Sequence, residues 1–346
     1  MKIAVVSDAW KPQRNGVVRV IESVVSRLET RGHEIEMITP DRFNTIPCPT
    51  YPEIRLALLP KRKVSRLLDD FAPDAVHIAT EGPLGQAAKA HCLKRGWPFT
   101  TAYHSKFPEY INERTGVPVS WLYAWMRRFH KQAHKVFCPS PSVYRELTAL
   151  GFQNALAWTH GVDTAIFRPR GQGFLAQRIT DRDLPRPFHA YVGRVTVDKN
   201  IPGFLDLDLP GTKFVVGDGP SRESLAKRYP DIPFIIVNSD DELAEAYSDA
   251  DVFVFPSKTD TFGLVMLEAL ACGTPVAALP VTGPLDVIGD APAGVLDQDL
   301  VAASAQAISI PADVARAHAE AFSWEVVADQ FLDHLAPIKA ETRIAA

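Results

Sequence analysis

The sequence predicts an α/β protein made of two doubly wound parallel sheets. Short apolar runs such as KIAVVSD and AVHIAT alternate with helical stretches along nearly the whole chain. Because these runs lack the alternation of a half-exposed strand, each is expected in a parallel sheet that is covered on both faces. The chain has 346 residues, more than one core comfortably serves. The strand–helix series also restarts once, which predicts two domains.

The elements follow in order along the chain. In the first half, strands are expected at KIAVVSD, HEIEMITP, AVHIAT, FTTAYH, KVFCPS and NALAWTHGV, with a helix from Val17 to Arg31. Residues 168–187 have little periodicity, which is typical of a linker. Strands resume at FHAYVGRV, TKFVVGDG, FIIVNS, DVFVFPS and TPVAALP, and the helix SWEVVADQFLDHL comes last. We therefore predict domains at residues 1–165 and 166–324, followed by this final helix.

Charge and composition narrow the functional classes. Residues 1–165 carry a net charge of +7 and residues 166–346 a net charge of −11, which indicates two domains with different partners, although chance and solubility would explain it too. The sequence has no run of about 20 apolar residues, so no membrane-spanning helix is predicted. The N-terminus is not typical of a signal peptide. The four cysteines have no metal-ligand spacing and favour a reducing cytoplasm; they are Cys48, Cys92, Cys138 and Cys272.

The most informative segment is KTDTFGLVMLEALACGTPVA, residues 258–277, which follows the strand DVFVFPS. Its loop leads into a helix that is expected to start near Gly263 and to end at Gly273. Backbone amides at such a helix N-terminus stabilise an anion without a metal. The carboxylates of Asp260 and Glu268 could each hold a pair of sugar hydroxyls. Alternatively, Asp260 caps the helix and Glu268 is an incidental surface acid.

Two further loops follow strands of the same domain. GRVTVDKN, residues 193–200, places Arg194 and Lys199 in one loop, where both can reach one diphosphate, unless they are two solvated surface cations. GDGP, residues 217–220, lets a ligand approach the backbone closely, or is a plain tight turn. Ligands bind at the carboxyl ends of parallel strands. The three loops would therefore offer cations, amides and carboxylates to one sugar nucleotide.

This ordered set of motifs resembles the retaining glycosyltransferases of family 4, which have the two-domain GT-B fold. In the C-terminal half the resemblance rests on GRVTVDKN, GDGP, DELAEAYSDADVFVFPS and TDTFGLVMLEALACGTPV. In the N-terminal half it rests on SDAWKPQRNGVVRV, TAYHSKFPEY and HGVDTAIFRP. The resemblance covers nearly the whole chain. It implies two Rossmann-like domains that face a cleft, with a C-terminal helix, about 325–346, that crosses back to the first domain.

The resemblance also implies roles for the donor-side residues. Arg194 and Lys199 would bind the donor diphosphate, Glu268 the ribose hydroxyls, and Asp260 the hydroxyls of the transferred sugar. The remaining donor-binding residues implied for this domain are Gly193, Gly217, Thr261, Phe262, Gly263 and Leu264. Asp260 stands where the family usually has Glu. The shorter acid, as TDTFG, occurs in a subset that resembles lipid-directed mannosyl, glucosyl and sulfoquinovosyl transferases.

In the N-terminal domain, the resemblance implies that Asn15 and Gly16 face the donor, with Asn15 on the acceptor side. It also places Tyr103 and His104 on the acceptor side, with His104 beside the reacting carbon; alternatively, His104 is a buried, hydrogen-bonded histidine. No carboxylate in the AYHSKF loop is an obvious nucleophile. We therefore expect front-face attack, with His104, Asp260, Arg194 and Lys199 as the catalytic set. We expect no metal and no cofactor, because cations and a helix terminus neutralise the diphosphate.

The acceptor is expected to be a lipid. Residues 121–135, WLYAWMRRFHKQAHK, combine apolar residues at helical spacing with cations, and KRKVSR at residues 61–66 adds more. A basic helix with tryptophans suits an anionic bilayer surface, with contacts from Trp121, Trp125, Arg127, Arg128 and Lys131. Alternatively, this is a core-packing helix whose charged side is wet. We expect a cytoplasmic protein that can lie peripherally on the inner membrane and has no nucleic-acid partner.

Three functions stay open from the sequence. The first is transfer of a hexose or uronic acid to a membrane lipid, with diacylglycerol as the most economical acceptor. The second is a transferase that uses GDP-mannose or a UDP-hexose and acts on a soluble or polysaccharide acceptor. The third, from another class, is a nucleotide-sugar epimerase on the same architecture.

Overall fold

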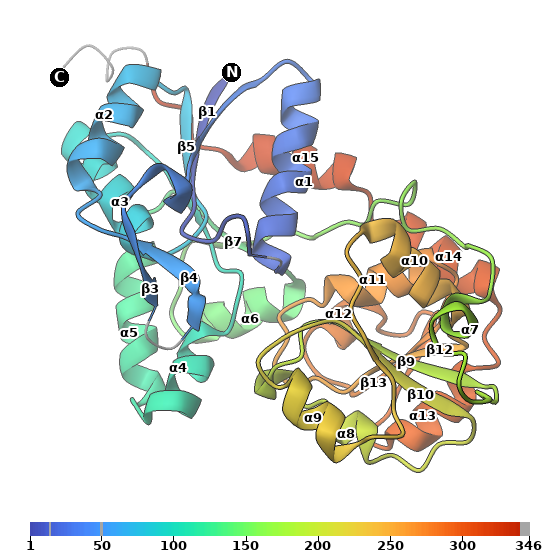
Figure 1. The fold of residues 1–346 in the computed structure, drawn as a ribbon. Coiled ribbons are helices and arrows are strands. Elements are labelled where there is room, and N and C mark those ends of the chain that lie inside the picture. The colour runs from blue at the N-terminus through green and yellow to red at the C-terminus, as the bar shows by residue number, and fades with distance from the viewer. Residues whose placement is uncertain (14, 49–50, 340–346) are drawn as a thin grey trace. The chain divides into compact units, whose positions relative to one another are not determined.

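The computed structural model describes residues 1–13, 15–48 and 51–339. It divides into two compact units, Met1–Thr159 with Trp324–Ala346, and His160–Ser323 (Figure 1). The observed division precedes the predicted one at 165/166. Val162 already belongs to the second unit, because its N–H donates to the Phe322 carbonyl (3.0 Å) and its side chain packs in that unit's core.

The first unit contains a six-stranded parallel sheet that includes all six strands predicted for this half. Its order is β2 (Glu34–Ile38), β1 (Lys2–Val6), β5 (Ala75–Ile78), β6 (Thr100–Ala102), β7 (Val136–Cys138) and β8 (Ala155–Ala157). The connecting helices are α1 (Gly16–Thr30), α2 (Lys61–Phe71), α3 (Pro83–Arg95), α4 (Phe107–Thr115), α5 (Val119–His130) and α6 (Pro141–Ala149).

An antiparallel hairpin in this unit was not predicted. It follows the 3₁₀ turn Pro40–Arg42 and pairs β3 (Thr45–Cys48) with β4 (Tyr51–Ala57), with Thr45 opposite Ala57. Three prolines in TIPCPTYPEIRLA hide its alternating pattern, because proline argues against a central strand. An edge hairpin tolerates them. The hairpin leads directly into α2.

The last helix, α15 (Trp324–His334), belongs to the first unit. The ring of Phe331 packs against those of His77 (centroids 4.9 Å apart) and Phe137 (5.8 Å), and the Trp158 indole N–H donates to the Val327 carbonyl (3.0 Å). An exposed ion pair joins Arg31 to Asp329 (2.5 Å). The buried aromatic contacts hold the helix, since exposed ion pairs contribute roughly 0–1 kcal/mol.

The second unit repeats the architecture. Its parallel sheet has the order β11 (Phe234–Ile235), β10 (Thr212–Val216), β9 (Phe188–Val192), β12 (Val252–Phe255), β13 (Val276–Ala278) and β14 (Gly294–Leu296); the last of these was not predicted. The helices are α7 (Phe174–Arg178), α8 (Pro202–Leu205), α9 (Arg222–Arg228), α10 (Asp240–Asp249), α11 (Leu264–Ala271), α12 (Pro284–Val287), α13 (Leu300–Ala307) and α14 (Ala312–Glu320), with a 3₁₀ turn at Val197–Lys199.

Both faces of this second sheet are buried, as the unalternating strands predict. Along β12, Phe253 and Phe255 join one apolar cluster, whereas Val252 and Val254 join another. Successive strand residues point to opposite faces, so two separate clusters on one strand mean that both faces are covered.

The predicted linker at residues 168–187 is instead folded against the second unit. It contains α7, whose Phe174 and Leu175 are buried. The buried Asp249 carboxylate accepts from the Gly173 and Leu175 N–H groups (3.1 and 2.9 Å) and from Arg186 (2.8 Å). The prediction failed because this anchor lies some 75 residues away in sequence, outside any local pattern.

The predicted helix over residues 121–135 is also corrected. The helix α5 ends at His130, and residues 131–135 are not helical. Tyr123, Met126 and Phe129 face the core, whereas Trp121 is 72% exposed and Trp125 is 42% exposed. The tryptophans therefore do not share the buried face.

One buried acid of the first unit has a raised pKa. Asp8, just after β1, is buried, and its carboxylate accepts from the Leu84 and Gly85 N–H groups (2.9 and 3.2 Å) at the start of α3. The Thr80 hydroxyl donates a third bond (3.0 Å). Burial outweighs these bonds and raises the pKa of Asp8 to about 6.

We expect Asp8→Asn to reduce the pH dependence of the free energy of unfolding between about pH 4 and pH 6. A carboxyl whose folded pKa is raised stabilises the fold fully below its unfolded pKa, near 4, and loses that contribution as pH rises through 6. The component is on the order of 3 kcal/mol. Urea unfolding across this range would measure it, with the exposed Asp70→Asn as control. An unchanged slope in Asp8→Asn would show that Asp8 does not titrate there.

Candidate active site

Three loops meet at the carboxyl edge of the second unit's sheet. They follow β10, β9 and β12, which are neighbours, and comprise residues 217–220, 193–200 and 256–263. The Val195 N–H donates to the Asp218 carbonyl (2.9 Å), and the Asn200 amide donates to the Pro256 carbonyl (3.0 Å). The chain thus brings together the three segments that the sequence selected.

The side chains of Lys199 and Asp260 form an ion pair at the centre of these loops. The lysine Nζ contacts Asp260 Oδ1 and lies 3.9 Å from Asp198 Oδ2, so one ammonium group is shared between two carboxylates. The other Asp260 oxygen, Oδ2, is buried and has no hydrogen-bond partner among the described residues. A buried acceptor in this condition carries a desolvation cost that a ligand hydroxyl would remove.

Two hydroxyl groups that sequence reasoning missed lie in the same loops. Thr196 and Ser257 are buried, and neither Oγ has a hydrogen-bond partner within the part of the chain that the structure describes. Such groups are uncommon in folded proteins and ask for an explanation. A single hydroxyl residue carries no spacing signal, so only the structure could select them.

The helix α11 begins at Leu264, close to the predicted start. Its N-cap is Gly263, at φ 89°, and no side chain caps it, so the alternative in which Asp260 is the cap is wrong. This positive φ favours glycine at position 263, whereas the nearest atom to an added Cβ is only the end of the flexible Met266 side chain (2.6 Å). Thr261 and Phe262, just before it, are buried. The N-cap residue itself therefore offers the first α11 amides no side-chain acceptor.

Glu268 lies inside α11 and is buried, so the alternative of an incidental surface acid is also wrong. Its Oε2 accepts a hydrogen bond from the Tyr247 hydroxyl (3.1 Å). A buried carboxylate is costly unless it is bonded, and carboxylates fixed in this way are common at binding sites.

The glycines of the other two loops serve the fold itself. A Cβ at Gly217 would come within 2.0 Å of the Gly193 carbonyl oxygen, so the two strand ends pack backbone against backbone. The Tyr191 hydroxyl donates to the Arg194 carbonyl (2.9 Å) and fixes the course of that loop. The Arg194 side chain is half-buried beside these contacts.

The site residues predicted in the first unit differ in burial and in the contacts that they make. Asn15 is the N-cap of α1, where its side chain accepts from the Val18 N–H (3.0 Å), and Gly16 is the first helical residue. His104 follows β6, and its ring lies 6.3 Å from that of Trp158. Tyr103 is buried, with its hydroxyl 3.3 Å from that of Tyr123. We therefore do not propose a direct contact between the Tyr103 side chain and an acceptor.

The proposed membrane cations also differ from one another. Arg128 and Lys131 are exposed, whereas Arg127 is half-buried and donates to the Leu150 carbonyl (3.0 Å). Among the described residues, no helix is long and apolar enough to span a bilayer. The same residues hold no cluster of three or more His, Cys, Asp or Glu suited to a metal ion.

Comparisons with known proteins agree with this geometry. The model for Glycosyltransferase Family 4 matches residues 14–166, and that for Glycosyl transferases group 1 matches residues 191–310. A GDP-mannose-dependent alpha-mannosyltransferase of Mycobacterium tuberculosis (strain CDC 1551 / Oshkosh) is 30% identical, over 98% of this chain and 97% of that protein. The Arabidopsis thaliana sulfoquinovosyl transferase SQD2 is 30% identical, over 79% and 58%. The alpha-monoglucosyldiacylglycerol synthase of Acholeplasma laidlawii is 25% identical, over 80% and 79%.

The solved structures show the same fold. Anabaena Alr3699/HepE, crystallised with UDP and glucose, aligns with a TM-score of 0.71 at 15% identity, over 96% of this chain and 98% of that one. Two parallel sheets of this kind and a full-length relative at 30% identity lead to one conclusion. The chain belongs to glycosyltransferase family 4 and is a glycosyltransferase with the GT-B fold that uses a nucleotide sugar.

Proposed function

We propose that this enzyme transfers a hexose or uronic acid, with retention of configuration and without a metal, to a membrane lipid, with diacylglycerol as the first acceptor to test. The Lys199 ammonium group, which lies between two carboxylates in the loops that lead to α11, carries this proposal. A lysine cation and the peptide N–H groups at a helix N-terminus together suit a diphosphate.

The chemistry follows from that charge. The acceptor hydroxyl would attack on the face from which the nucleoside diphosphate leaves, and the leaving phosphate oxygen would take its proton. Arg194, Lys199 and the α11 amides would neutralise the negative charge that grows on the diphosphate. One such donor is typically worth roughly 10²–10³ in rate. Asp260 would accept from sugar hydroxyls, Glu268 from ribose hydroxyls, and His104 would lie beside the reacting carbon.

The name of one relative supports a lipid acceptor, because it is the synthase of a diacylglycerol-linked product. The other two relatives are named for sulfoquinovosyl transfer and for a GDP-mannose donor, and their names do not state the acceptor. The exposed Trp121 and Trp125 with the exposed Arg128 and Lys131 give α5 a surface suited to lipid headgroups. A soluble or polysaccharide acceptor is the second candidate, and the donor panel below separates the two.

A panel of UDP-glucose, UDP-galactose, UDP-glucuronate and GDP-mannose tests the proposal. Each donor is offered with diacylglycerol, with a membrane extract, or with soluble sugars and polysaccharides. We expect one donor to yield a glycolipid. Lys199→Ala and Glu268→Ala should each lose roughly 10² or more in rate, because each removes a group that contacts the donor. Lys258→Ala is the matched control, since this exposed lysine lies in the same loop as Asp260.

Three outcomes would contradict parts of the proposal. Full activity in both variants would remove the site assignment. Product formed only on sugars or polysaccharides would replace the lipid acceptor. Loss of donor binding on chelation, measured by calorimetry, would end the metal-independent mechanism.

Asp260→Asn should bind free UDP or GDP more tightly than the wild-type enzyme, by roughly five- to tenfold. The carboxylate competes with the diphosphate for the Lys199 ammonium group, and the amide does not. Turnover should fall nonetheless, because the amide is a weaker acceptor for the sugar hydroxyls. Asp198→Asn, whose carboxylate is farther from Lys199, should change nucleotide affinity less. Unchanged or weaker nucleotide binding by Asp260→Asn would show that no such competition exists.

A further inference from the structure

Each unit has a point at which the strand order of its parallel sheet reverses. In the second unit the chain runs from β9 to β10 and β11 on one side and then to β12 on the other, so the order reverses between β9 and β12. Lys199 follows β9 and Asp260 follows β12, so the candidate active site lies at this point. Ligands of open parallel sheets bind in the crevice that such a reversal leaves at the carboxyl edge. The second unit follows this rule.

The same rule locates a crevice in the first unit. Its chain runs from β1 to β2 on one side and later to β5 on the other, so the order reverses between β1 and β5. Asp8 follows β1 and Glu81 follows β5. The Asp8 N–H donates to Thr80 Oγ1 (2.7 Å), which connects the two strand ends. Because the acceptor is expected in this unit, the two acids are the first side chains to consider for its binding.

The Asp8 carboxylate is already engaged by the fold. It accepts from the Leu84 and Gly85 N–H groups and from the Thr80 hydroxyl. It also lies so close to Gly82 that a Cβ added there would be 2.4 Å from the Asp8 Cγ. Asp8 therefore occupies two amides at the start of α3 that would otherwise suit an anionic ligand.

Glu81 has one carboxylate oxygen engaged and the other open. Its Oε1 accepts a hydrogen bond from His130 Nε2 (3.1 Å), since an ionised carboxylate can only accept. The other oxygen, Oε2, receives no hydrogen bond from a residue that the structure describes, and the side chain is 19% exposed. Glu81 can therefore accept a hydrogen bond from a ligand.

His130 fixes the direction of this carboxylate. Its ring is fully buried at the end of α5, and its Nδ1 lies 2.8 Å from the hydroxyl of Thr101 in β6. The ring of Phe129 packs edge-on against it, with centroids 4.9 Å apart. A buried ring with both nitrogens bonded has one orientation, so the donor that it offers to Glu81 is fixed. Binding groups are held in this way when their geometry matters. The strand β6 also leads to His104, which was predicted on the acceptor side.

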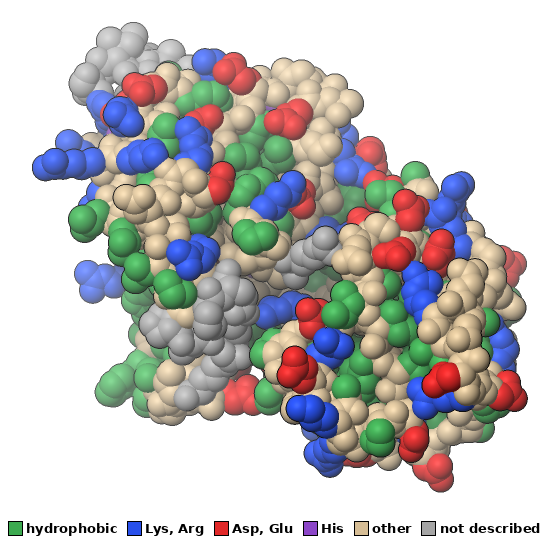
Figure 2. All heavy atoms as spheres, viewed as in Figure 1, with side chains coloured by type: hydrophobic (Ala, Val, Ile, Leu, Met, Phe, Trp, Pro, Cys, Tyr) green, Lys and Arg blue, Asp and Glu red, His purple; other side chains and the backbone are tan. Residues whose placement is uncertain are grey.

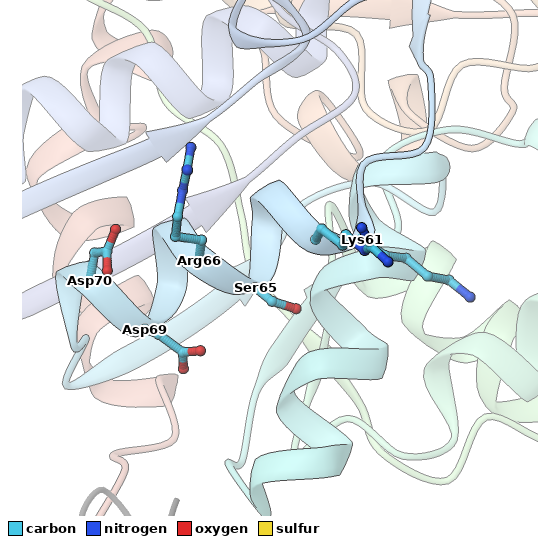
Figure 3. A pocket seen from close by; sticks show the side chains of 6 residues that line it. Lys61, Ser65, Arg66, Asp69 and Asp70 are labelled. Atoms are coloured by element: carbon cyan, nitrogen blue, oxygen red, sulfur yellow. The ribbon is translucent and has the colours of Figure 1, made fainter.

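The charge at this crevice differs from that of the outer surface. Along α2, Asp69 and Asp70 line a shallow depression of about 480 Å³ together with three cations of the same helix (Figure 3), and Asp69 pairs with Arg95 (2.7 Å). Figure 2 shows acidic and basic side chains interspersed over the visible face of both units. Within the described part of the chain, neither Asp8 nor Glu81 pairs with a lysine or an arginine. An acceptor with a phosphate group would be repelled here, whereas an uncharged hydroxyl group would not.

We propose that Glu81 binds a hydroxyl group of the acceptor other than the one that reacts, and that the acceptor presents an uncharged polyol, either the sugar of a glycolipid or a free sugar. The reacting hydroxyl passes its proton to the leaving phosphate, so Glu81 holds a second hydroxyl. His130 is the positioning residue for Glu81. This inference rests on the proposed function for the reaction and deepens it by naming the chemical class of the acceptor.

Equilibrium binding to the full-length protein in neutral detergent micelles, with UDP and GDP present and no sugar donor, tests this. The probes are monoglucosyldiacylglycerol, diacylglycerol, phosphatidylglycerol and free maltose. We expect monoglucosyldiacylglycerol to bind roughly tenfold more tightly than diacylglycerol, because diacylglycerol has no second hydroxyl for the charged Glu81. Phosphatidylglycerol should also bind roughly tenfold more weakly, because its phosphate meets two carboxylates.

Glu81→Gln keeps the contact with His130 and removes the charge. It should weaken the binding of monoglucosyldiacylglycerol by roughly five- to tenfold, and it should reduce the discrimination against phosphatidylglycerol. A purely structural role would not change that discrimination. Glu36→Gln is the matched control, because Glu36 is also half-buried and paired, with Arg42 (2.6 Å), but lies within β2. UDP and GDP should bind both variants as they bind the wild-type enzyme.

Two variants test the positioning role. His130→Leu removes the donor to Glu81 and should weaken glycolipid binding as Glu81→Gln does, whereas His130→Gln keeps a donor and should restore part of it. Circular dichroism shows whether these buried variants fold. If they do not, the preferences of the wild-type enzyme and of Glu81→Gln still decide.

Several outcomes would overturn the proposal. They are unchanged binding by Glu81→Gln, a wild-type preference for diacylglycerol or phosphatidylglycerol, and binding of none of the probes. If maltose alone binds and Glu81→Gln weakens it, the role of Glu81 stands and the lipid acceptor of the proposed function fails. The two failures are thereby told apart.

Discussion

The chemistry that we propose for this enzyme depends on one ammonium group. The Lys199 side chain lies between the carboxylates of Asp198 and Asp260, at the edge where three strands of the second sheet end. Because the sheet is parallel, its strand ends meet at one edge. A backbone hydrogen bond and one from the Asn200 side chain connect the loops that follow these strands. The fold thus fixes a charge that a mobile surface lysine could not fix. The proposed reaction depends on this, since a preorganised cation stabilises developing charge without reorganisation cost.

The shorter acid at position 260 has a physical consequence. Asp reaches less far than Glu, and here the carboxylate contacts the lysine through one oxygen, while the other is buried and receives no hydrogen bond from the residues that the structure describes. The buried hydroxyls of Thr196 and Ser257, in the same loops, also have no hydrogen-bond partner among those residues. These three groups form a polar surface that is incompletely satisfied by the protein itself. That is the condition in which a site rejects ligands lacking a matching hydroxyl, because a wrong ligand leaves buried groups unpaired.

The sequence predicted much of the fold and of the candidate site, and the predictions that failed have a common cause. Asp260, Glu268 and Lys199 could be selected from the sequence alone, because each lies near a strand end or a helix start that local patterns predict. The helix α7 and the hairpin were missed because a distant acid, Asp249, anchors one and prolines mask the other. The helix predicted over residues 121–135 was placed too far along the chain, because apolar spacing continues past His130, where α5 ends. Thr196 and Ser257 needed burial, which only the tertiary structure supplies.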